Sequence, residues 1–113
     1  MRIAQLAPLV ECVPPSGYGG TELVVSLLTE ELVARGHEVT LFATGDSATK
    51  ARLVPVIDEG LRKSGVNPTR WTAYDLRSLI KIKDMQDQFD IIHNHMGFQA
   101  LPFLDALKIP VVT

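Results

Sequence analysis

Short apolar runs alternate with longer segments of mixed polarity along the chain, and this alternation predicts strands separated by helices. Each run holds about four to six residues, the usual length of a buried strand. Pro55 stands inside the third run, which places that strand at an edge of the sheet because proline cannot donate a ladder hydrogen bond. The predicted strands are Arg2–Ala7, Val39–Ala43, Leu53–Ile57, Asp90–His93 and Ile109–Thr113.

Apolar residues at helical spacing mark three of the intervening segments. The first predicted helix, 20–36, opens with a threonine cap and an acidic first turn and ends at a glycine. The second runs from 69 to about 88, and the third, 97–107, is short because Pro102 must lie in its first turn. The side chains expected to face the core are Leu23, Val24, Leu27, Leu28 and Leu32 in the first helix, and Leu76, Leu79, Ile80 and Phe89 in and after the second.

Strands that alternate with helices predict an α/β fold, a Rossmann-like doubly wound parallel sheet. Right-handed crossovers favour the strand order 3-2-1-4-5, with the fifth strand cut short at Thr113. In such sheets ligands bind beyond the carboxyl ends of the strands, where the strand order reverses. Three predicted loops meet at that edge and hold most of the polar residues of interest: Pro8–Gly20, Thr44–Ser47 and His93–Gly97.

Composition narrows the class of protein. The chain has 113 residues, 46% hydrophobic, enough for one domain. A net charge of −2 argues against a nucleic-acid partner. Cys12 is the sole cysteine, so no intrachain disulfide can form, and an idle thiol is the favoured interpretation. The N-terminal apolar run is too short for a signal peptide, and no run could cross a bilayer, so the expected location is cytoplasmic.

A glycine-rich segment, Gly17–Glu22, joins the first loop to the first helix. Glycines allow close approach of a bulky anion, and a helix N-terminus offers free N–H groups, so a phosphate group fits here. The segment matches neither the dinucleotide fingerprint nor the Walker pattern, because the loop is long and no lysine follows the glycines. A simple turn explains the same glycines equally well.

Two histidines, His93 and His95, end the fourth predicted strand and flank Asn94. In an extended segment they point to the same side, as two metal ligands would. No third ligand is evident; Cys12, Asp46 and His37 are the loose candidates. The alternatives are that His95 hydrogen-bonds a polar substrate while His93 packs under the loop, or that both are structural.

Asp46 follows the second strand, where Rossmann enzymes place an acid that binds ribose. The surrounding Thr44–Ser47 segment is equally suited to a turn, which is the favoured interpretation.

A basic segment lies between Leu61 and Lys83, in which Asp75 is the only acid. A solvated helix face is the favoured interpretation, and a surface for anionic lipid at the membrane is the alternative. Its basic residues are Arg62, Lys63, Arg70, Arg77, Lys81 and Lys83.

The order of several motifs resembles the N-terminal domain of family 4 (group 1) retaining glycosyltransferases, which have the GT-B fold. The resemblance covers nearly the whole chain. It rests on Met1–Pro8, Pro14-Pro15, Tyr18–Glu22, Leu32–Ala43 and Asp90–His95.

The resemblance implies transfer of a sugar from a nucleotide-sugar donor to an acceptor, with retention of configuration, and no cofactor or metal. It implies that residues 1–113 form the acceptor-side domain and that the donor-binding C-terminal domain is absent. Gly19, Gly20 and Thr21 would form the loop near the donor diphosphate, and His95 would lie near the transferred sugar as the catalytic candidate. Candidate acceptor contacts are Tyr18, Asp46 and His93.

Alone, the chain is expected to be inactive, because the donor-binding domain is missing. It is also expected to self-associate, because its last strand would leave an unpaired edge. Two other functions remain open from the residues. One is a nucleotide-dependent oxidoreductase or epimerase of Rossmann type, and the other is a non-catalytic binding module.

Overall fold

The computed structural model describes residues 1–113 and contains one five-stranded sheet with the order β3-β2-β1-β4-β5. All neighbouring strands are parallel, which confirms the predicted topology and the edge position of the third strand. The strands are β1 (Arg2–Leu6), β2 (Glu38–Ala43), β3 (Arg52–Pro55), β4 (Ile91–Asn94) and β5 (Val111–Val112).

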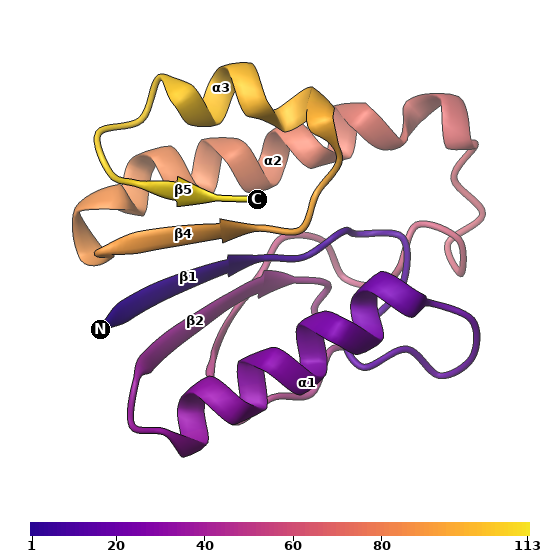
Figure 1. Ribbon diagram of the computed structural model, residues 1–113. Helices are drawn as coiled ribbons and strands as arrows, with labels where there is room; N and C mark the ends of the chain where they lie inside the picture. Colours follow the sequence, from indigo (N-terminus) through magenta and orange to yellow (C-terminus); the bar gives the residue numbers. More distant parts are fainter.

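Helices cover both faces of the sheet. Figure 1 shows α1 (Gly20–Ala34) on one face and α2 (Trp71–Met85) with α3 (Leu101–Asp105) on the opposite face. Short 3-10 turns extend the helices at Pro68–Arg70, Gln86–Gln88 and Phe98–Ala100. The three predicted helices are present, with the second one continuous through its flanking turns. The expected threonine cap was wrong, because Gly19 is the cap residue of α1, no side chain caps its N-terminus, and Thr21 already lies in its first turn. No helix combines the length and apolar character that crossing a bilayer requires.

Alternation of side chains along the strands divides the core into two clusters. On the α2 face, Leu6, Phe42 and Ile92 belong to a cluster of 13 buried residues. On the α1 face the cluster has only five buried residues, among them Val25 of α1 and Leu41 of β2. The α1 face is therefore the less apolar one, and it is also the face on which the two histidines lie.

Helix α1 packs with its polar side against the sheet, and the expected orientation was wrong. Its buried residues are Glu22, Val25, Ser26 and Thr29. The side chains expected to face the core point outward instead: Leu23, Val24 and Leu27 are exposed, and Leu28 and Leu32 are only half-buried. On the inward side, Thr29 Oγ1 accepts a hydrogen bond from the buried amide of Gln5, which a leucine at that position could not do.

Helix α2 differs in a smaller way from expectation. Leu79 is buried as predicted, but Leu76 and Ile80 are exposed and Ile82 takes the buried position. The basic segment is partly neutralised, since Arg62 pairs with Glu11 at 3.0 Å and Lys63 with Glu59 at 3.4 Å. The guanidinium of Arg77 lies 4.9 Å from the ring centroid of Tyr74.

Candidate functional site

The three expected loops do meet at the carboxyl edge of the sheet. The backbone N–H of Val13, in the proline-rich loop, donates to Ser47 Oγ at 2.9 Å, and the N–H of Ala48 donates to the Val13 carbonyl at 2.8 Å. Thr44 Oγ1 donates to Asp46 Oδ1 at 2.5 Å. Asp46 itself is exposed, so its carboxylate serves the turn on one side and faces solvent on the other.

The two glycines at the start of α1 have different roles in the structure. A Cβ at Gly19 would lie 2.8 Å from Pro15 Cβ, so Gly19 allows the loop to fold back on itself. A Cβ at Gly20 would have nothing within 4 Å. The backbone at Gly20 is therefore open to a bulky ligand, with Thr21 exposed beside it.

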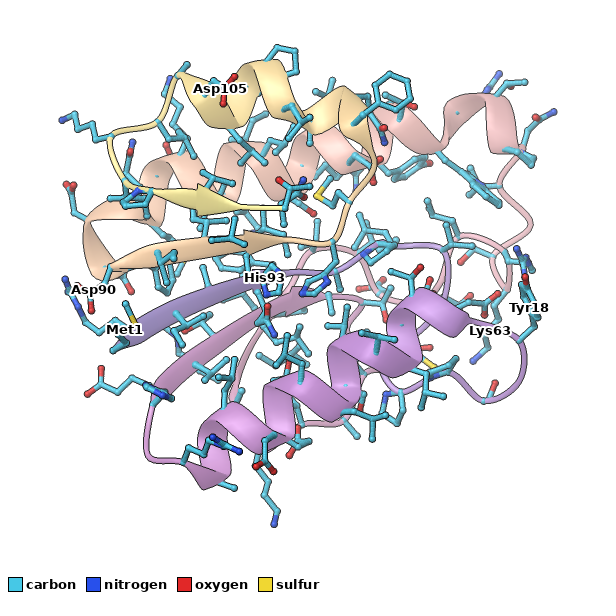
Figure 2. The ribbon with its side chains drawn as sticks, viewed as in Figure 1. Met1, Tyr18, Lys63, Asp90, His93 and Asp105 are labelled. Atoms are coloured by element: carbon cyan, nitrogen blue, oxygen red, sulfur yellow. The ribbon has the colours of Figure 1, made fainter.

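Tyr18 extends from the glycine loop and is 84% exposed. Figure 2 places Tyr18 near Lys63, at the end of the molecule opposite Met1 and Asp90. The guanidinium of Arg62 lies 5.9 Å from the Tyr18 ring centroid. This position leaves the phenol free to contact a second molecule.

Glu22 lies beneath the glycine loop, and sequence reasoning assigned it only to the helix dipole. The residue is 5% exposed, and burial raises the pKa of its carboxyl. Backbone N–H groups of Glu22 itself and of Glu11 oppose that rise by stabilising the charged form. A carboxylate of the protein therefore already uses part of the hydrogen-bonding capacity of this helix N-terminus.

The structure brings His93 and His95 together on the α1 face of the sheet. Their ring centroids lie 4.0 Å apart, and the backbone N–H of His95 donates to the Leu6 carbonyl at 2.9 Å. Figure 2 shows His93 near the middle of the molecule, between the sheet and α1. Burial, and secondarily the neighbouring His93, lower the pKa of His95 to about 4, so its imidazole is neutral at pH 7. Burial also lowers the pKa of His93.

Gln5 supports this pair from within the sheet. Its Oε1 lies 2.9 Å from His95 Nε2, and its Nε2 donates to Thr29 Oγ1 at 3.3 Å. Sequence reasoning missed Gln5. The available signal was its position as the one polar residue between Ile3 and Ala7 in an otherwise apolar strand.

A pocket of about 250 Å³ lies beside the glycine loop, under the start of α2. Trp71 separates it from the hollow at Gly20, and its indole N–H donates to the Val66 carbonyl at 3.0 Å. Burial raises the pKa of Asp75 in this pocket, while the Gln99 amide donates to its carboxylate at 3.1 Å. A larger hollow, about 580 Å³, opens at the opposite edge of the sheet around Arg52, away from the three loops.

The arrangement offers no cluster of three or more His, Cys, Asp or Glu side chains that could hold a metal ion. The Cys12 thiol donates to the Pro14 carbonyl at 3.2 Å, within the proline-rich loop. What the carboxyl edge does offer is open backbone at Gly20, a neutral histidine and nearby hydroxyl and carboxylate groups. These groups suit the recognition of a polar, hydroxyl-rich ligand.

Comparison with known proteins agrees with this chemistry. The family model described as Glycosyltransferase Family 4 matches residues 18–113. Among solved structures the chain is similar to AviGT4, a glycosyltransferase involved in avilamycin A biosynthesis, with 26% identity and a TM-score of 0.55. That alignment covers 85% of this chain and 27% of AviGT4, so the chain spans a minor part of that protein's length. No curated protein matches the chain. Because the family model matches most of the chain, the chain belongs to glycosyltransferase family 4.

Proposed function

We propose that this chain is the acceptor-side, N-terminal domain of an enzyme that transfers a sugar from a nucleotide-sugar donor to an acceptor with retention. The observation that carries the proposal is the family match over residues 18–113, which includes both the glycine loop and the histidine pair. The donor nucleotide would be held by a second domain. The similarity to a structure that is itself a glycosyltransferase supports the same class of reaction.

The glycine loop would receive the donor diphosphate. Gly20 leaves space for it, and the first turn of α1 supplies N–H groups and the positive end of the helix dipole. These fixed dipoles would stabilise the charge that develops on the leaving diphosphate, and no metal ion of this domain is needed for that effect. Thr21 would add a hydroxyl beside the phosphate oxygens.

His95 would contact the transferred sugar through a hydrogen bond. Because burial lowers its pKa to about 4, His95 is a poor general acid at neutral pH. We therefore assign it a neutral hydrogen bond that strengthens in the transition state. The acceptor would contact Tyr18 and Asp46, which are exposed on the loops, and the half-buried His93 at the end of β4.

The test uses the longer protein that carries this domain. His95→Ala should lower kcat more than it raises KM, because the lost interaction forms mainly in the transition state. His93→Ala is the matched variant at the neighbouring ring, and it should cost stability and raise the KM for the acceptor rather than lower kcat. Stoichiometric zinc found by elemental analysis, or an intact kcat in His95→Ala, would contradict the proposed roles.

A further inference from the structure

Three polar side chains form a continuous chain between α1 and the histidine pair. Thr29 and Gln5 are both fully buried, at 0% exposure. Gln5 bonds Thr29 on one side and His95 on the other, at 3.3 and 2.9 Å. Buried amides need such partners, because each unpaired polar group in the interior costs about 1–3 kcal/mol.

The direction of these bonds determines which nitrogen of His95 carries the proton. The Gln5 amide nitrogen donates to Thr29, so the Gln5 carbonyl oxygen faces His95 Nε2. A carbonyl oxygen only accepts, so Nε2 must be the donor. At neutral pH the His95 ring has one N–H, because its pKa is about 4. Its Nδ1 therefore carries the lone pair.

The Nδ1 atom is free to meet a ligand. No protein hydrogen bond to it is present, and the only fully buried side-chain atoms without partners are Ser78 Oγ and Asn94 Nδ2. His95 Nδ1 is not among these atoms, so it is not fully buried at the carboxyl edge of the sheet. A neutral lone pair in that place accepts a hydrogen bond but cannot give one.

We propose that Gln5 is a positioning residue that holds His95 as its Nε2–H tautomer, so that the site presents Nδ1 as an acceptor for a hydroxyl hydrogen of the sugar. The identity of that hydroxyl rests on the proposed function; the tautomer does not. The consequence is a specificity rule. A sugar bearing a hydroxyl at that position is bound, whereas one bearing a fluorine, an O-methyl group or a carboxylate there has no hydrogen to donate and is disfavoured.

The test measures the tautomer directly in the 113-residue chain labelled with ¹⁵N-histidine, at neutral pH and without ligand. In the unaltered chain we expect the lone-pair nitrogen of His95 to be Nδ1, with a protected Nε2–H proton. Gln5→Met removes the acceptor at nearly constant volume. The ratio of Nε2–H to Nδ1–H tautomers should then fall roughly tenfold, the bias that one buried hydrogen bond supplies, toward the ratio in the urea-unfolded chain.

Two further variants separate positioning from simple packing. Gln5→Glu keeps an oxygen acceptor, so it should restore the Nε2–H tautomer and raise the pKa of His95 by adding a neighbouring negative charge. Thr29→Val frees the Gln5 amide to rotate, so it should lower the ratio of Nε2–H to Nδ1–H tautomers, but by less than Gln5→Met does. Both keep the test valid if Gln5→Met fails to fold.

An Nδ1–H tautomer in the unaltered chain, or an unchanged ratio in Gln5→Met, overturns the proposal; if Gln5→Met does not fold, an unchanged ratio in Thr29→Val overturns it. The tautomer measurement needs neither the sugar donor nor the sugar acceptor, so its outcome is independent of sugar transfer. If the tautomer is as expected but the longer protein transfers no sugar, the proposed function fails and the positioning role remains.

Discussion

Acidification should destabilise the fold through His95. The pKa of its imidazole falls from the ordinary 6.5 to about 4 on folding, because the ring is partly buried beside His93. Between these two pKa values, the His95 ring is therefore protonated in the unfolded chain and neutral in the folded chain. The free energy of unfolding keeps its full value above pH 6.5, the pKa of His95 in the unfolded chain. It falls as the pH drops toward about 4, the pKa of His95 in the folded chain.

The size of the effect follows from the shift. Each pKa unit corresponds to about 1.36 kcal/mol, so near pH 5 the undiscounted loss is about 2 kcal/mol. Because the ring is partly open to solvent, the penalty for charging it in the folded chain is smaller. We therefore expect the free energy of unfolding to fall by about 1 kcal/mol. Urea unfolding at neutral pH and near pH 5, followed by fluorescence of Trp71, measures this loss in the unaltered chain and in His95→Gln.

The comparison between the two chains isolates the imidazole. Glu22 and Asp75 titrate with raised pKa values and Asp90 with a lowered one, but all three are present in both chains and cancel in the difference. His93→Gln should remove a smaller part of the acid sensitivity. If the stability difference between the unaltered chain and His95→Gln is the same at both pH values, His95 does not titrate as argued and its neutral role fails.

Three other predictions concern the glycine loop, the sheet edge and the basic segment. Gly20→Val should leave the melting temperature nearly unchanged and lower the turnover of the longer enzyme. Gly19→Val should instead lower the melting temperature, because its side chain meets Pro15. Equal shifts in the melting temperatures of the two variants would refute this contrast. The 113-residue chain should self-associate through β5, where Val112 is 48% exposed, and light scattering across a dilution series that shows only monomer would refute it. If Arg70, Arg77 and Lys81 meet a membrane, binding to vesicles with anionic lipid should fall with salt and with reversal of these three charges. No binding at low salt would leave this helix as a solvated face.

The topology was predictable from the sequence because it depends on features that repeat along the chain. Apolar runs and glycine or proline punctuation place each strand, and the handedness of crossovers then leaves few orders for the sheet. Pro55 alone was enough to place β3 at an edge. These signals are local, and each can be interpreted without knowing what packs against it.

The orientation of α1 and the role of Gln5 were not predictable in the same way. Apolar periodicity shows that a helix has two unlike faces, but it does not say which face meets the sheet. The face that meets the sheet includes Thr29, whose hydrogen-bond partner Gln5 lies 24 residues away along the chain. Likewise, Gln5 and His95 are 90 residues apart, and only the pairing of β1 with β4 reveals their contact.

The central position of β1 also has a consequence for the time course of folding. Ile3 pairs with Val39 on one side and with Ile91 on the other, so the first strand to be synthesised has one neighbour that arrives late. Until α2 leaves the ribosome, β1 and β2 can pair, but Leu6 and Phe42 lack the helix that covers them in the finished fold. We expect the nascent chain to expose this apolar surface until α2 has been synthesised and to be prone to aggregation at that stage. Long-range parallel pairing of this kind is slow to form, so closing β4 onto β1 should set the folding rate.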